Sequence, residues 1–110
     1  MGHDVISLLK RKAEKCCNNL FEFAAFVNET EFLADQHPYL FSGDEKRIKY
    51  KELWWTLEEL NACALHDWEK SDKPLDFTKY WTVRYNQDAI ELVRSFVNTI
   101  DQLIMCVDIE

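Results

Sequence analysis

Glycine and proline are scarce in this chain of 110 residues, which contains only two of each. Folds rich in β-strands place these residues at their tight turns, so the scarcity argues against such a fold. Hydrophobic residues make up 47% of the chain and charged residues 30%, which is the balance of an ordinary folded domain. We therefore expect a single all-α domain over residues 1–110.

The chain also lacks the motifs that enzymes and metal sites require. It has no glycine-rich phosphate loop, no recognisable Ser-His-Asp signature and no Glu-x-x-His pair of the kind that binds iron in helical bundles. Its four cysteines show neither a CxxC motif nor zinc-ligand spacing with histidine. We predict a protein that is not an enzyme and that binds no metal and no cofactor.

Three of the four cysteines, Cys16, Cys17 and Cys63, are predicted to pack as small apolar side chains. Cys106 falls on the polar side of the last predicted helix, where it is a reactive thiol, is covered by the chain end or has no role. All four thiols are expected to be reduced, because adjacent cysteines are poorly placed to form a disulfide and no other pairing pattern is evident.

Basic residues are outnumbered, with 13 Lys and Arg against 20 Asp and Glu, for a net charge of −7. Such a chain repels nucleic-acid phosphates and anionic lipid heads and attracts basic proteins. The N-terminal region has no signal-like apolar run, and no segment reaches the length of a membrane span. We expect a cytoplasmic protein with a basic protein partner, without direct contact with nucleic acid or membrane.

Apolar residues recur at three- and four-residue spacing along most of the chain, which predicts amphipathic helices. Three long helices are expected. The first covers residues 4–27, the second begins at a capping box at 42–45 and ends at about Lys70, and the third covers 86–107. Two short helices are expected at 30–36, after a capping pair of Asn28 and Glu31, and at 76–82, capped by Asp76. Because such helices need each other's apolar faces, we predict an antiparallel bundle.

The longest predicted helix contains two adjacent tryptophans, whose side chains point about 100° apart. A helical wheel places Trp54 on an apolar arc, which comprises Tyr50, Leu53, Trp54, Leu57, Leu60, Ala64, Leu65 and Trp68. Trp55 falls outside this arc, among glutamates. Either Trp55 is exposed as the aromatic anchor of a binding site, or a segment at 31–41 or 76–81 folds over it.

Asn61 also lies inside the apolar arc. We interpret it as a buried polar residue that fixes the helix register, the alternative being a side chain turned toward a loop carbonyl.

Acidic residues are concentrated in two regions that are expected to be neighbouring helices. Residues 52–72 hold six acids and one lysine, and residues 86–110 hold five acids and one arginine. Such faces produce a field that steers a basic partner. We predict a partner-binding site that consists of Trp55, Glu52, Glu58, Glu59, His66, Asp67 and Glu69.

A small acidic helical chain without catalytic motifs resembles the bacterial immunity proteins that neutralise toxins, including those of contact-dependent growth inhibition. The resemblance is one of type over the whole chain and involves no motif, so no functional residue can be transferred from it. It implies tight binding to a cognate toxin, often a nuclease whose basic active site an acidic surface would cover. Two alternatives are a phage-encoded nucleic-acid mimic of the anti-CRISPR kind and a structural or adaptor domain of a larger complex.

Overall fold

The protein is described here by a computed structural model, which covers residues 3–104 and 108–109 and the side chains of 5–104. The described residues form α1 (Val5–Ala13), α2 (Leu20–Gln36), the 3-10 turn η1 (Pro38–Leu40), α3 (Asp44–Lys70), α4 (Thr78–Arg84) and α5 (Asn86–Ile100). Two two-residue strands, β1 (His3–Asp4) and β2 (Asp108–Ile109), pair in antiparallel fashion. The predicted all-α class is confirmed. Across the described part of the chain, no helix combines the length and apolarity needed to cross a membrane.

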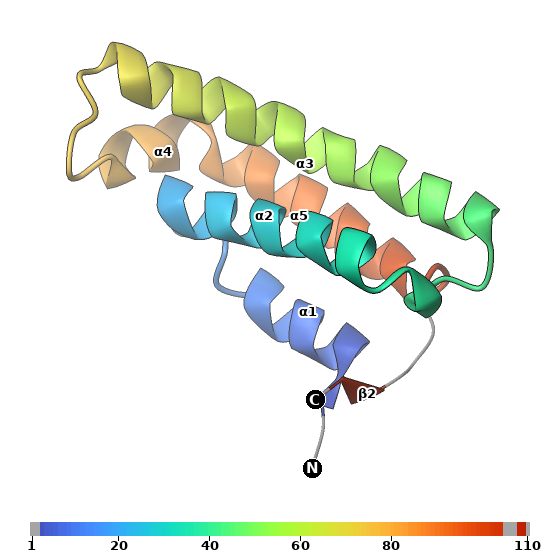
Figure 1. Ribbon diagram of the computed structural model, residues 1–110. Helices are drawn as coiled ribbons and strands as arrows, with labels where there is room; N and C mark the ends of the chain where they lie inside the picture. The colour runs from blue at the N-terminus through green and yellow to red at the C-terminus, as the bar shows by residue number, and fades with distance from the viewer. Residues whose placement is uncertain (1–2, 105–107, 110) are drawn as a thin grey trace.

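The helices surround one elongated core (Figure 1). α2 and α3 lie side by side and run in opposite directions, and α5 packs against α3. α1 lies along α5 and also contacts α2, whereas the short helix α4 packs against α5 at the end of the molecule where α3 terminates. The molecule measures 43 × 30 × 22 Å.

The predicted helix over residues 4–27 is wrong, because the chain turns at 14–19 and forms α1 and α2 instead. Asn19 begins α2, and its side-chain oxygen accepts a hydrogen bond from the Glu22 N–H at 2.9 Å. That bond satisfies one of the amide groups that the start of a helix leaves unpaired. The expected cap at Asn28 is also wrong, since Asn28 is an interior residue of α2 and residues 30–36 complete this helix rather than forming another.

The other predicted helices need smaller corrections. α3 spans Asp44–Lys70, but its N-cap residue is Gly43 and no side chain forms a capping hydrogen bond there, so the predicted capping box is wrong. Asp76 does accept a hydrogen bond from the Thr78 N–H at 3.0 Å, although α4 begins at Thr78. α5 ends at Ile100, earlier than predicted, and residues 105–107 of the predicted last helix lie outside the described residues.

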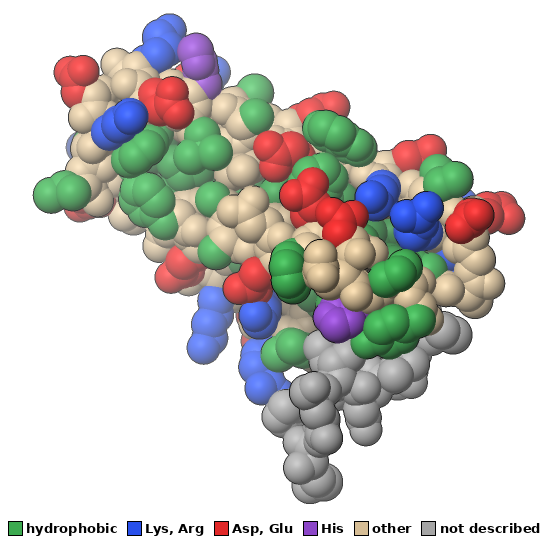
Figure 2. Space-filling view, viewed as in Figure 1, with side chains coloured by type: hydrophobic (Ala, Val, Ile, Leu, Met, Phe, Trp, Pro, Cys, Tyr) green, Lys and Arg blue, Asp and Glu red, His purple; other side chains and the backbone are tan. Residues whose placement is uncertain are grey.

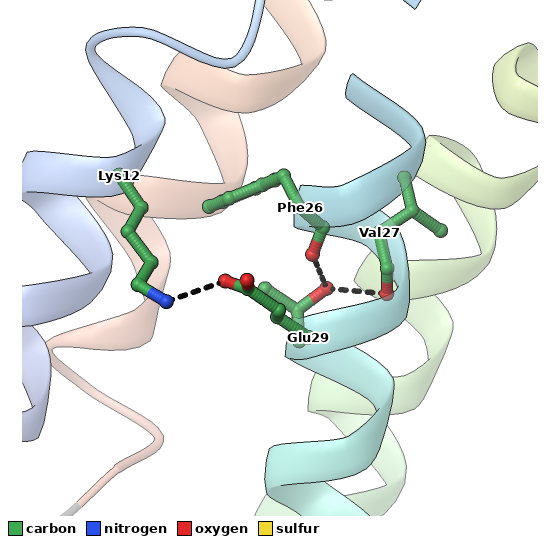
Figure 3. A network of polar contacts seen from close by, with 5 residues as sticks. Lys12, Phe26, Val27 and Glu29 are labelled. Atoms are coloured by element: carbon green, nitrogen blue, oxygen red, sulfur yellow. Dashed lines mark hydrogen bonds and ion pairs between the residues drawn. The ribbon is translucent and has the colours of Figure 1, made fainter. Parts of the chain in front are cut away.

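α1 and α2 are joined by a surface ion pair between the Lys12 Nζ and a Glu29 carboxylate oxygen, 2.6 Å apart (Figure 3). On the inner side of α2, the buried Thr30 hydroxyl lies 2.9 Å from the carbonyl oxygens of both Phe26 and Val27, to which it donates. This local bonding satisfies a hydroxyl that would otherwise be costly to bury. The inner face of α2 can therefore pack tightly against α3.

The core is rich in aromatic rings that connect the helices. Phe96 of α5 contacts Phe26 of α2 and Tyr50 of α3 edge to face, with ring centroids 6.2 and 5.3 Å away. The Tyr50 hydroxyl donates to the Thr30 carbonyl at 2.7 Å, and the Trp54 indole N–H donates to the Val27 carbonyl at 2.8 Å. The polar groups of both buried aromatic side chains therefore have a hydrogen-bond partner.

The apolar arc predicted for α3 is confirmed. Every member of it is buried or partly buried against the core: Tyr50, Leu53, Trp54, Leu57, Leu60, Ala64, Leu65 and Trp68. Asn61 is buried as predicted, with 4% of its surface exposed, and its Oδ1 atom accepts no hydrogen bond from any described residue. The role of Asn61 in helix register stays a prediction.

Candidate partner-binding surface

Trp55 lies on the outer side of α3 with 56% of its surface exposed. Neither of the two segments that could have covered it does so. Its ring contacts that of Trp54 at a centroid distance of 5.2 Å and an interplanar angle of 65°. Because Trp54 is fixed by the core and by its bond to Val27, the exposed indole rests on a rigid support. This geometry suits an aromatic anchor, since little conformational freedom is left to lose on binding.

Glutamates surround Trp55 on the same helix. Glu52 and Glu58 are three residues away and Glu59 is four residues away, which are the spacings of neighbouring side chains on a helix surface. None of these three carboxylates forms an ion pair with a residue that the structure describes. The negative charge next to the indole is therefore available to a partner.

A fourth carboxylate near Trp55 comes from another helix. Glu31 of α2 and Trp55 line the same small hollow, of about 120 Å³, between α2 and α3. Lys51 also borders this hollow, but its Nζ atom is 3.0 Å from a carboxylate oxygen of Asp35, which compensates its charge. Sequence reasoning missed Glu31, because no spacing along the chain shows which residues of α2 lie beside Trp55.

We name Trp55, Glu52, Glu58, Glu59 and Glu31 the Trp55 surface. The other predicted site residues, His66, Asp67 and Glu69, lie nearer the end of α3. Twelve residues separate Trp55 from Asp67, which corresponds to about 18 Å along a helix. The predicted set is thus spread along α3 rather than gathered at one point.

Asp67 belongs to a network with α4 and the residue that follows it. Its Oδ2 atom accepts hydrogen bonds from the hydroxyls of Tyr85 and Tyr80, the latter at 3.1 Å, and lies 3.8 Å from the Arg84 Nε. The Tyr85 hydroxyl is the main cause that lowers the pKa of Asp67 below its usual value. Burial is the main cause that raises the pKa of Tyr85, to about 12. Asp67 therefore joins α3 to α4. The other two predicted site residues near this end of α3, His66 and Glu69, are exposed.

The contribution of Asp67 to stability should depend on pH. Its pKa is lower in the folded chain than in an unfolded one, so its carboxylate stabilises the fold above the unfolded pKa of about 4, and this stabilisation is lost as the pH falls through the folded value. In urea unfolding, the midpoint difference between wild type and Asp67→Asn should be largest near neutral pH and shrink below pH ~4. Glu69→Gln is the control, and an Asp67→Asn difference constant over the whole pH range would contradict the expectation.

The expectation of two acidic helices holds only for the part of α3 from residue 52 onward, since residues 44–51 carry four basic and two acidic residues. α5 does pack against α3, but its exposed acids are Asp88 and Glu91, and Arg94 offsets one of them. Asp101, which follows α5, pairs with Lys10 of α1 at 3.1 Å. Figure 2 shows Lys and Arg side chains at the lower edge of the face, near α1, and also among the Asp and Glu side chains toward the start of α3.

The cysteines differ in their surroundings. Cys16 and Cys17 are buried in the turn between α1 and α2, with their Sγ atoms 3.8 Å apart, as expected of packing residues. Their mutual hydrogen bond, followed by burial, raises the pKa of Cys16. Cys63 is exposed on α3, so its predicted packing role is wrong, and Cys106 lies outside the described residues. Among the described residues, no three His, Cys, Asp or Glu side chains are grouped so that they could hold a metal ion.

Comparison of the chain with family models, with curated proteins and with solved structures gives no match. On the Trp55 surface, which joins four residues of the predicted site with Glu31, an exposed aromatic side chain and uncompensated charge coincide.

Proposed function

We propose that this protein is an inhibitor of the immunity-protein type, which binds a cognate basic toxin, most simply a nuclease, and covers it. The observation that carries the proposal is the exposed Trp55 ring, supported from below and bordered by uncompensated glutamates. Interfaces concentrate their binding energy in a few aromatic anchors that insert into pockets of the partner. The protein acts in the cytoplasm, without a cofactor or a metal and without catalysis of its own.

The bundle supports this role as a rigid platform. α2, α3 and α5 act as its three long helices, packed in antiparallel order, and hold the outer face of α3 in place. A surface that is ordered before binding loses less entropy when the complex forms. Trp55 inserts into the partner, and the surrounding carboxylates face the partner's basic residues.

The charges of the Trp55 surface set the rate and the specificity of association. Glu52, Glu58 and Glu59 attract a basic protein and repel an acidic one, and salt screens this attraction. A nuclease active site that binds phosphate groups offers the complementary positive charge. Inhibition follows because the bound chain excludes the nucleic-acid substrate from that site.

The experiment is capture of proteins from cells of the source organism on the immobilised chain, followed by measurement of Kd for the protein retained. Trp55→Ala should weaken binding by about 2 to 4 kcal/mol, which is about 30- to 1000-fold in Kd. Phe32→Ala is the matched control, because Phe32 has 62% of its surface exposed and borders a different hollow of α2. The Phe32 variant should bind within a few-fold of wild type.

The outcomes separate the classes of function. One basic protein that is held by wild type, lost with Trp55→Ala and inhibited in a nuclease assay supports the proposal. Retention of a nucleic-acid-binding complex regardless of Trp55 contradicts it and favours a nucleic-acid mimic. A partner whose association rate does not change with salt contradicts charge steering and favours an adaptor domain.

A further inference from the structure

A second exposed apolar surface lies at the end of the molecule formed by α4 and the segment that precedes it. Val83 has 82% of its surface exposed and Leu75 is wholly exposed. Val83 borders an open hollow of about 580 Å³, which Pro74, Phe77 and Tyr80 also line. Hydrophobic side chains gather over this end of the molecule in Figure 2. We name this feature the α4 hollow.

The segment beside the α4 hollow is held in a defined conformation. Asp72 and Lys73 have positive φ angles of 65° and 50°, which cost energy for residues other than glycine. Trp68 holds the segment there, since its indole N–H donates to the Pro74 carbonyl at 2.9 Å and its own carbonyl accepts from the Lys73 N–H at 3.0 Å. The ring of Phe21 packs edge to face on Trp68, at 5.5 Å. Leu75 is therefore exposed on an ordered segment.

Positive charge borders the α4 hollow, in contrast to the chain as a whole. Residues 70–84 contain four basic and two acidic residues, while the chain has a net charge of −7. Lys79 forms no ion pair with any described residue. The Arg84 guanidinium lies over the Tyr85 ring, 5.8 Å from its centroid, and 3.8 Å from Asp67, but 64% of the Arg84 side chain is exposed. The acids nearby already accept hydrogen bonds, Asp76 from the Thr78 N–H and Asp67 from two hydroxyls.

We propose that the α4 hollow binds an acidic segment of a second protein partner through a large apolar side chain that fills it. A carboxylate next to that side chain pairs with Arg84, whose planar guanidinium can bind both carboxylate oxygens, and a second one pairs with Lys79. The complementary charge selects an acidic segment over a basic one. Fifteen residues of α3, about 22 Å, separate Trp55 from the end of the helix at Lys70, so this site is distinct from the Trp55 surface.

The test is a selection of displayed random peptides of about 12 residues against the intact protein, followed by fluorescence anisotropy with the enriched sequences. Enriched peptides should carry Asp or Glu next to Leu, Ile, Phe or Trp. Val83→Ser and Lys79→Glu should each weaken their binding at least ~10-fold. Trp55→Ala should leave it unchanged, which separates this site from the proposed inhibitor surface. Both α4 substitutions are at exposed positions, and thermal melting verifies that each variant is folded.

Four outcomes would overturn the proposal. These are the absence of enriched peptides, enrichment of basic peptides, equal binding by wild type and both α4 variants, and loss of binding with Trp55→Ala alone. Sedimentation of the wild type provides a further criterion. A dimer that Val83→Ser converts to a monomer would show that the hollow binds a second copy of this chain instead.

Discussion

Replacement of Trp81 by alanine is expected to lower the free energy of unfolding by about 3 to 5 kcal/mol, a large part of the stability of a domain of this size. Trp81 is fully buried, with its ring centroid 5.4 Å from that of Phe23 and 5.7 Å from that of Tyr85. Its indole N–H donates to the Cys17 carbonyl at 2.8 Å. The substitution therefore leaves a cavity and also releases the turn between α1 and α2.

Trp81→Phe separates the two effects. It retains an aromatic ring, and the Cys17 carbonyl still accepts a hydrogen bond from the Asn86 side chain at 2.7 Å. We expect a loss of about 1 to 3 kcal/mol, for the smaller ring and the missing donor. Urea unfolding followed by circular dichroism measures both variants. Equal losses below 1 kcal/mol for the two substitutions would show that Trp81 is not a central core residue.

The adjacent tryptophans of α3 should respond to substitution in opposite ways. Trp54→Ala should cost about 3 to 5 kcal/mol, because the buried ring is removed and the Val27 carbonyl loses the indole N–H that donates to it. Trp55→Ala should cost about 1 kcal/mol or less, because it removes mainly an exposed ring and one aromatic contact. Urea midpoints of the two variants, compared with wild type, provide the measurement.

This pair of variants also bears on the interpretation of the binding experiment. If Trp55→Ala is nearly as stable as wild type, a loss of partner binding reports on the surface and not on unfolding. Comparable destabilisation by both substitutions would mean that Trp55 is a structural residue, and its assignment as an anchor would then fail.

The extent of α3 could be predicted from its apolar pattern, although the capping box expected at its start does not form. The break between α1 and α2 could not, because apolar spacing continues through residues 14–19 without glycine or proline. The capping signal at Asn19 is matched by a similar one at Asn28, and only the first is used. Tertiary contacts distinguish the two positions. The turn before Asn19 is held by hydrogen bonds from Trp81 and Asn86 to the Cys17 carbonyl, and these residues lie 64 and 69 positions further along the chain.

The position of Trp55 outside the apolar arc could be predicted from the helical wheel, but its exposure could not, because either of two segments could have folded over it. The contribution of Glu31 could not be foreseen, because it depends on how α2 and α3 are placed against each other. The same holds for Asp67, which by spacing along α3 resembles any surface acid. Tyr80 and Tyr85 can donate hydrogen bonds to Asp67 only because the chain folds back after α3 and places α4 beside the end of that helix.

The packing of α1 along α5 has a consequence for synthesis on the ribosome. α2 and α3 are neighbours in sequence and can pair early, whereas α1 is made well before α5, one of its main partners. About 80 residues separate the two helices, which corresponds to roughly 4 to 16 seconds of translation. During that interval α1, whose side chains of Val5 and Leu9 are buried in the finished fold, lacks its contacts with α5. The nascent chain is then most exposed to aggregation, or to capture by a chaperone, at its N-terminal helix.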